Sequence, residues 1–468
     1  MAKKFIIIIF LLLLIISPRV IAGLNNEKIA QQAAHSGEFE KAAAEYEMAA
    51  LRLFWRGDLW SELGSAKLLS GQKEDALIAF RIAKEKGALS AFGWDFLGLE
   101  NWQKGNLEMA LIIWREGLVF HPDFAKFYSR LAVAYREKGD YASEKDALIR
   151  WLRLEDGTEK KAPYHYRLGL LFFLDSPEKA LGELSSALRA DSEFAPVVDT
   201  LRTSLNLALL ESDPALSNIL LGRGLALAEE WELAAEIFTR VTQDYPTNAS
   251  AWAWLGEAKE HLDENALSDL DRALNLNPNS ALVHSLRGLY WQRRGDFVEA
   301  IKEFRAAVKL EPENPNLYTA LGEVYAHSGD SLLALEAYEQ ATSLAPDNPF
   351  YWQLLALFST QYLVELEEIG LAAAKKAVAL SPTDAEFVDT LGQVYFRLEE
   401  DEEAEKQFLF ALVLDPSFGA AHLHLGIFHL KHNHLDLAYQ SLLQARDFSH
   451  GTLIEEQALR LLSEYFKK

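Results

Sequence analysis

The 468-residue chain contains no cysteine. That absence excludes disulfides, thiolate metal sites, cysteine nucleophiles and a lipid-modified cysteine. Proline is scarce, at 14 residues, and β-branched residues rarely alternate with polar ones. Because alanine and leucine dominate instead, the sequence predicts an all-helical fold. The lack of cysteine also slightly favours a bacterial envelope protein over a secreted eukaryotic one, whose domains often use disulfides.

Positive charge is also in short supply. The chain carries 46 Lys and Arg against 69 Asp and Glu, for a formal charge of −23. Such a surface repels phosphate groups at long range, so it disfavours nucleic acid as a ligand and flat binding to anionic lipid. The partner expected from this charge is a protein or peptide that is itself neutral or basic.

The N-terminus has the layout of a secretory signal peptide. Lys3 and Lys4 precede an apolar run, FIIIIFLLLLII, and Ser17-Pro18 is expected to end its helix before Ala22. The run of 12 residues covers roughly 18 Å at about 1.5 Å per residue, less than the ~30 Å hydrocarbon core of a bilayer.

We therefore expect residues 1–22 to direct export and to be cleaved off after Ala22. The alternative is that residues 5–22 remain as an anchor in the cytoplasmic membrane, which would be the chain's only membrane contact. In both cases the positive N-terminus stays inside, and the rest of the chain lies outside the cytoplasm as a periplasmic, secreted or cell-envelope protein.

Small residues recur along the chain at a nearly constant interval. Gly64, Gly98 and Ala132 are each 34 residues apart, and the series continues to Gly426. A bulky residue usually precedes each by three or four positions, and two alanines flanking a large apolar residue follow about twelve positions later. Many units end on a proline. This pattern predicts a helical hairpin in which small residues allow two helices to approach closely. Glycine in Gly-Asp or Gly-Asn pairs turns the chain between them.

The repeat resembles the tetratricopeptide repeat (TPR) family. The best unit, NPNLYTALGEVYAHSGDSLLALEAYEQATSLAPDNP, carries the family's characteristic residues at Tyr318, Leu321, Gly322, Tyr325, Gly329, Ala334, Tyr338, Ala341 and Pro346. The resemblance implies an all-α, right-handed superhelical solenoid. We expect about twelve hairpins with a C-terminal capping helix.

The departures from the repeat predict how the array is divided. An N-terminal array spans 24–191 and a C-terminal array 216–446, separated by an irregular helical boundary at 192–215 that fits no hairpin. Residues 451–468 read as the capping helix. One unit has Glu144 where alanine is expected. The unit after Gly256 is two residues short in its turn, and the one after Ala356 is about two too long.

The sequence shows no catalytic motif, cofactor site or phosphate-binding loop, and we predict that the chain is not an enzyme. Five histidines between His422 and His434 form the one unusual cluster. Their helical spacing could hold a divalent ion. The favoured interpretation is that His422 and His429 are packed core residues, because other units have aromatics at these positions, so no metal site is predicted.

In the TPR family the first helices line a concave groove that takes peptides or a partner helix, and the resemblance implies such a groove here. Its expected lining in the N-terminal array is Phe92, Asp95, Trp102, Tyr166 and Phe173. In the C-terminal array it is Arg293, Thr319, Glu323, Phe350, Gln353, Gln361, Gln393, Phe396 and Arg397. The Lys/Arg/Asn set with which chaperone-binding members clamp a terminal carboxylate is not reproduced.

These features predict a non-enzymatic protein-binding scaffold of the cell envelope, similar to TPR components of envelope assembly, secretion or polysaccharide export. The alternative is a regulatory or docking subunit for a separate enzyme such as a glycosyltransferase. An intrinsic enzyme ranks third, because no span is left over for a catalytic domain.

Overall fold

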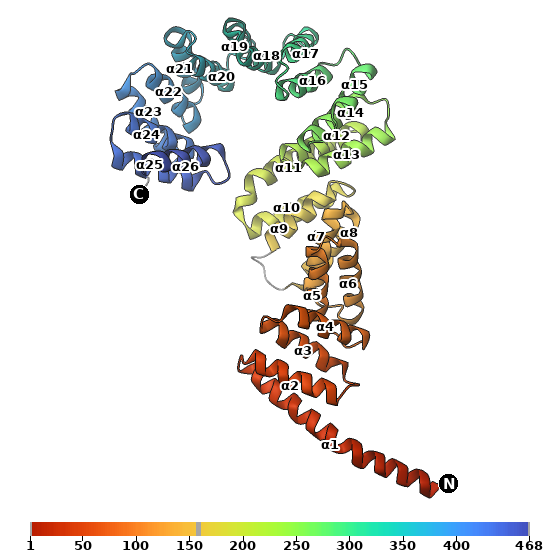
Figure 1. Ribbon diagram of the computed structural model, residues 1–468. Coiled ribbons are helices and arrows are strands. Elements are labelled where there is room, and N and C mark those ends of the chain that lie inside the picture. The colour runs from red at the N-terminus through yellow and green to blue at the C-terminus, as the bar shows by residue number, and fades with distance from the viewer. Residues whose placement is uncertain (1, 156–160, 467–468) are drawn as a thin grey trace. The chain divides into compact units, whose positions relative to one another are not determined.

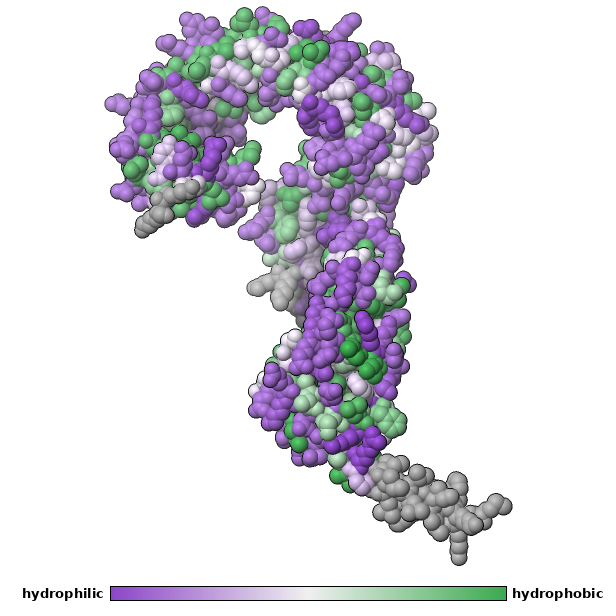
Figure 2. All heavy atoms as spheres, in the orientation of Figure 1, coloured by the Kyte–Doolittle hydropathy of each residue, from purple (hydrophilic) through white to green (hydrophobic). Residues whose placement is uncertain are grey.

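The computed structural model describes the backbone of residues 2–155 and 161–466, and the side chains of 18–155 and 161–466. Every regular element in these residues is a helix, which confirms the all-α prediction (Figure 1). None of the described helices is both long enough and apolar enough to cross a membrane. Polar and apolar residues are mixed over the visible surface (Figure 2).

The chain divides into two compact units, Met1–Arg202 and Thr203–Lys468. The helices of the first unit are α1 (Ala2–His35), α2 (Phe39–Arg52), α3 (Gly57–Leu69), α4 (Lys73–Glu85), α5 (Ala91–Gln103), α6 (Leu107–Phe120), α7 (Ala125–Lys138), α8 (Tyr141–Leu154), α9 (Ala162–Phe172) and α10 (Pro177–Ala190). A short 3-10 turn, η2 (Ser192–Phe194), leads into α11 (Ala195–Leu210), and the division falls within α11.

The second unit continues with α12 (Pro214–Leu227), α13 (Trp231–Asp244), α14 (Ala249–His261), α15 (Leu267–Leu276), α16 (Ala281–Arg293), α17 (Phe297–Leu310), α18 (Pro315–Ser328), α19 (Ser331–Leu344), α20 (Pro349–Tyr362), η3 (Leu366–Gly370), α21 (Leu371–Leu380), α22 (Ala385–Arg397), α23 (Asp401–Leu414), α24 (Gly419–Lys431), α25 (Leu435–Phe448) and α26 (Leu453–Tyr465). In the described residues, consecutive helices form five hairpins before α11 and seven after it. This agrees with the expected solenoid of about twelve.

Each hairpin is held by a small residue of its first helix packed against a large residue of its second. A Cβ added to Gly64 would lie 2.6 Å from Phe80, and one added to Gly288 would lie 2.8 Å from Phe304. Both phenylalanine rings are fully buried. The repeating glycine is therefore needed because the ring that follows sixteen residues later occupies the space of a side chain.

A hydrogen bond that recurs between hairpins explains one aromatic position of the repeat. Trp252 and Trp352 donate from the indole nitrogen to the carbonyl oxygens of Pro246 and Pro346, at 2.9 Å in each case. The same contact is made at 3.1 Å by Tyr128 to Pro122 and at 3.0 Å by His284 to Pro278 and His422 to Pro416. A ring with a polar edge at this position packs and also satisfies the proline carbonyl.

Three departures from the repeat have structural explanations. Glu144 is fully buried and binds the guanidinium groups of Arg136 and Arg167, at 2.8 Å from the Nε atom of each. It thus joins α8 to the first helices of its own hairpin and of the next. The short unit after Gly256 shortens α15 to ten residues. The extra residues after Ala356 are accommodated by the π-helical turn η3, and Leu363 and Glu365, which precede it, have positive φ.

The expectation that Ser17-Pro18 ends the first helix is wrong. α1 continues through Pro18 to His35, and Gly23 packs against Leu53 of the first hairpin. A proline removes one backbone donor and bends a helix without always ending it, and here packing against α2 holds the following turns in place. The side chains of residues 1–17 lie outside the described part of the chain.

Candidate partner-binding groove

The first helices of the second unit carry two adjoining hollows. The first hollow, about 560 Å³, lies between α18 and α20, with Tyr338 of α19 behind it. The second hollow, about 520 Å³, lies between α20, α22 and α24, with Phe408 of α23 behind it. Both are lined by Leu357 and Gln361 of α20, so the two hollows form one groove across successive first helices.

The first hollow combines apolar walls with a carboxylate. Phe350 and Leu354 of α20 face Thr319 and Glu323 of α18. Thr319 and Glu323 are four positions apart on α18, and Phe350 and Leu354 are four apart on α20. Positions four apart share one face of a helix, so each pair lines the hollow together. Phe350 keeps 46% of its surface exposed. It is therefore available to contact another chain.

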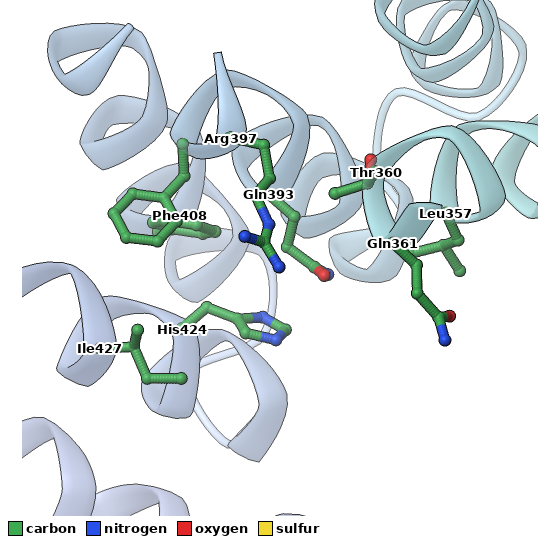
Figure 3. Close-up of a pocket in the computed structure, with 9 residues that line it drawn as sticks. Leu357, Thr360, Gln361, Gln393, Arg397, Phe408, His424 and Ile427 are labelled. Carbon is green, nitrogen blue, oxygen red and sulfur yellow. The ribbon is translucent and has the colours of Figure 1, made fainter. Parts of the chain in front are cut away.

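The second hollow is polar on one side and apolar on the other. Arg397 and Gln393 of α22 and His424 of α24 point toward the same space (Figure 3). Phe396, Leu357 and Ile427 supply apolar lining. Such a site can hold an apolar group that also carries hydrogen-bond acceptors or a negative charge.

A buried aspartate organises the polar side. Asp389 is 2% exposed and accepts hydrogen bonds from His424 Nδ1 at 2.9 Å and from Gln393 Nε2 at 3.0 Å. Burial lowers the pKa of His424, but the charge of Asp389 and the hydrogen bond to it outweigh that effect. The pKa of His424 is therefore raised above its ordinary value. The imidazole is held in place and favours its protonated form.

Two charged groups of the groove have no internal partner. Neither the Arg397 guanidinium nor the Glu323 carboxylate forms an ion pair or hydrogen bond with any described residue. Most other charges on the first helices are paired, as Arg293 is with Glu257. The groove thus presents a free cation in one hollow and a free anion in the other.

Seven of the nine residues predicted for the C-terminal groove line these hollows, namely Thr319, Glu323, Phe350, Gln361, Gln393, Phe396 and Arg397. Gln353 and Arg293 do not. Gln353 is 3% exposed and donates to Glu386 at 3.0 Å and Thr390 at 3.1 Å, so it fastens α22 to α20. Arg293 fastens α16 to α14 through Glu257. Whether the seven bind a partner stays a prediction.

Part of the expected N-terminal lining is also buried. Phe173 is 1% exposed, and Asp95 is 2% exposed and forms ion pairs with Lys126 at 2.8 Å and Arg130 at 3.2 Å. The expectation that these two face a groove is therefore wrong. Both residues have the right spacing, but Asp95 pairs with the next hairpin and Phe173 is buried in the core.

The histidine cluster is mostly structural. His422 and His429 are 6% and 5% exposed, as expected for packed core residues. His434 precedes α25 as its N-cap. Among the described residues, no group of three or more histidine, aspartate or glutamate side chains is placed to hold a metal ion.

The sequence did not predict the other residues that line the groove, among them Leu357, Ile427 and His424. Leu357 and Ile427 are ordinary apolar residues of first helices, with nothing in their type to mark them. His424 belongs to the histidine cluster, and that cluster does not mark it as a groove residue. A signal was available, because Asp389 lies 35 residues earlier, close to one repeat. Residues one period apart occupy neighbouring first helices and can meet.

Stacked helical hairpins with a lined first-helix face define the class of helical-repeat binding proteins. Within it, family models described as TPR repeat and tetratricopeptide repeat match residues 293–329 and 315–348. These matches confirm tetratricopeptide repeats in residues 293–348, as the sequence predicted. Arrays of this repeat bind peptide or protein partners and are generally non-catalytic.

Curated relatives match over part of their length. Superkiller complex protein 3 of Homo sapiens is 27% identical over 229 residues, which is 43% of this chain and 14% of that protein. The Mus musculus protein of the same name is 26% identical over 235 residues, 44% of this chain and 15% of that one. The match thus spans only about a seventh of these relatives.

Two solved structures align with most of the chain at low sequence identity. The yeast Tom70 structure is 17% identical, covering 94% of this chain and 95% of that chain with a TM-score of 0.43. The APC/C hetero-tetramer Cut9-Hcn1 is 14% identical, covering 93% and 95%, with a TM-score of 0.41. The fold assignment therefore rests on the hairpins and the family models.

Proposed function

We propose that the chain is a non-enzymatic scaffold that binds a segment of a partner protein in the groove on α18, α20, α22 and α24. The observation that carries this proposal is the pair of adjoining hollows with Arg397 and Glu323 free of internal partners. An arginine and an exposed aromatic ring beside apolar walls are the residue types that dominate protein interfaces.

The groove's charges indicate the kind of segment that it fits. A carboxylate or backbone carbonyl of the partner would bind Arg397, and a basic or amide group would bind Glu323. Apolar side chains between them would contact Phe350, Leu357 and Phe396. The groove therefore fits a dipolar, amphipathic segment. This is a narrower prediction than the one from the overall negative charge, which indicates only a neutral or basic partner.

We further propose that the scaffold works outside the cytoplasmic membrane, in envelope assembly, secretion or polysaccharide export. Support comes from the sequence, in which Lys3 and Lys4 precede the apolar run of residues 5–16. The packing of α1 favours retention of this segment over cleavage. Cleavage after Ala22 would remove Arg19, which donates a hydrogen bond to the Leu51 carbonyl at 3.1 Å. Mass spectrometry of the mature N-terminus tests this: retention gives a start before Gly23.

Selection from a displayed peptide library by the purified chain tests the groove proposal. We expect the enriched peptides to have an acidic residue at one end and a basic residue at the other, with apolar residues between them. Their enrichment should fall with the Arg397→Ala chain and persist with Arg460→Ala, a matched exposed arginine on α26. Peptides that bind the Arg397→Ala chain equally well would refute the proposal. Capture of an enzyme, such as a glycosyltransferase, would favour the docking-subunit alternative over an assembly scaffold.

A further inference from the structure

The open end of the first hairpin exposes a group of large apolar side chains. Phe54 and Trp55, in the loop after α2, are 61% and 53% exposed and pack edge to face at 5.2 Å. On the two helices of this hairpin, Ile21 and Leu24 of α1 and Leu51 of α2 are 66%, 48% and 52% exposed. Single exposed apolar residues occur all along this array and mean little alone. What distinguishes this group is its place in the fold.

The group lies where α1 leaves the folded unit. Gly23 of α1 packs against Leu53, and the guanidinium of Arg19 reaches the Leu51 carbonyl. Because α2 runs antiparallel to α1, the loop that carries Phe54 and Trp55 lies beside residues 19–23. The same helix continues from there into the apolar run of residues 5–16 (Figure 1).

We propose that this hairpin end is a lipid-contact surface, with Phe54 and Trp55 seated at the headgroup level of the bilayer that the apolar run enters. The inference rests on the proposed retention of residues 1–22 and is separate from the groove. Aromatic rings favour the membrane interface because their ring faces are apolar and the indole N–H can remain hydrated.

The spacing along α1 fits this placement. Residues 19–23 begin three residues after the apolar run ends at Ile16, so the loop lies about 5–10 Å farther along the helix axis. The headgroup layer on each side of a bilayer is about 5–8 Å thick. When the apolar run is in hydrocarbon, the loop is therefore at the depth of the headgroups.

One basic side chain contacts the loop that carries the aromatic pair, and another lies nearby on α1. Lys86 donates from Nζ to the Phe54 carbonyl at 2.9 Å, and both Lys86 and Arg19 are exposed. Cations at this depth can bind lipid phosphates, while their stems cover apolar surface. The chain's net negative charge opposes strongly anionic membranes, so the surface suits zwitterionic lipid best.

The absence of native cysteine allows a direct test with the full-length chain. A single cysteine at Phe54→Cys, and separately at Trp55→Cys, is labelled with an environment-sensitive fluorophore and mixed with phosphatidylcholine vesicles. The matched control is Phe120→Cys, because Phe120 is 55% exposed in the same unit at the end of α6. Vesicle flotation is measured on the same samples, and circular dichroism verifies that each variant is folded.

We expect the chain to float, and the probes at positions 54 and 55 to shift to shorter wavelength and be quenched by lipids brominated near the headgroup. The probe at position 120 should do neither. A chain that fails to float would overturn both the membrane attachment and this inference. A chain that floats while positions 54 and 55 behave like position 120 would overturn the lipid contact alone. Protection of these positions only in native membranes would assign the surface to a protein partner instead.

Discussion

At the scale of residues, the repeat is specified by steric pairs that a sequence can reveal. The small residue of each first helix and the large residue of each second helix recur with the same period, so their packing could be predicted. The pairing of Asp389 with His424 could not be assigned as readily, because many acidic residues lie near one period from a histidine. Which of them meet depends on side-chain direction, which periodicity does not fix.

The steric role of the repeat glycine predicts opposite effects at two glycines. Gly288→Ala places a Cβ 2.8 Å from the fully buried Phe304, and we expect it to destabilise the fold by about 1–3 kcal/mol. Gly182 lies in the exposed middle of α10, and a Cβ added there would meet no neighbouring side chain or other element within 4 Å. Gly182→Ala should therefore stabilise the fold by up to about 1 kcal/mol. Urea unfolding of both variants measures the difference. Equal changes in the free energy of unfolding would show that helix propensity, and not steric contact, determines the effect of replacing the glycine.

A buried charge cluster between α16 and α17 predicts a pH dependence. Burial lowers the pKa of His284 and raises that of Glu303. For His284, the hydrogen bond to Glu303 at 2.6 Å outweighs burial and the nearby Arg287 guanidinium, which both lower its pKa, so the pKa of His284 is raised. For Glu303, the hydrogen bonds from His284 and Arg287 outweigh burial, so the pKa of Glu303 is lowered. The stabilisation from Glu303 is present above its unfolded pKa, about 4.3, and is lost as pH falls through the folded value. The stabilisation from His284 is present below its unfolded pKa, about 6.5, and is lost as pH rises through the folded value.

The two windows overlap between about pH 4.3 and pH 6.5. We therefore expect the difference in free energy of unfolding between the native chain and Glu303→Gln to be largest there and to shrink on either side. Denaturant unfolding at a series of pH values measures it. A difference that grows steadily above pH 7 would contradict the assigned signs.

At the scale of elements, the number and type of helices could be predicted because each hairpin repeats the same signal. Two features could not. The extra residues after Ala356 were visible as a change of spacing, but their form as the π-helical turn η3 depends on how the chain closes against α20. The passage of α1 through Pro18 depends on packing with α2, which overrides the local preference of proline.

Nearest-neighbour stacking predicts how a local defect spreads. Ala334 of α19 is fully buried, and Ala334→Trp should cost about 1–3 kcal/mol or more because it forces two helices apart. Hydrogen exchange should then rise in α18–α19 and the adjoining hairpins before it rises in distant ones. Uniform protection across all hairpins in the variant would contradict a solenoid of coupled neighbours.

At the scale of the whole molecule, the sequence predicted the groove better than it predicted the groove's occupant. First-helix periodicity identified seven of the lining residues, including Phe350 and Arg397. It misplaced Gln353, since the choice between facing a groove and bridging two hairpins is a matter of side-chain direction. The identity of the partner lies in another chain, so residue patterns here can give only its chemistry.

The central claim is that the first-helix groove of the second unit binds the partner, and one comparison of affinities tests it most directly. The partner is the protein or peptide captured by the full-length chain. The groove variant carries Phe350→Ala and Arg397→Ala, and the control variant carries Phe410→Ala and Arg460→Ala. The control is matched because Phe410, on α23, is 43% exposed and Phe350 is 46% exposed. Circular dichroism verifies that both variants are folded.

Loss of a central aromatic or arginine contact costs about 2 kcal/mol or more, so the groove variant should bind at least about thirtyfold more weakly. The control variant should keep the native affinity. Full affinity in the groove variant, together with loss of binding in the control, would contradict the account and identify the second-helix face as the binding surface.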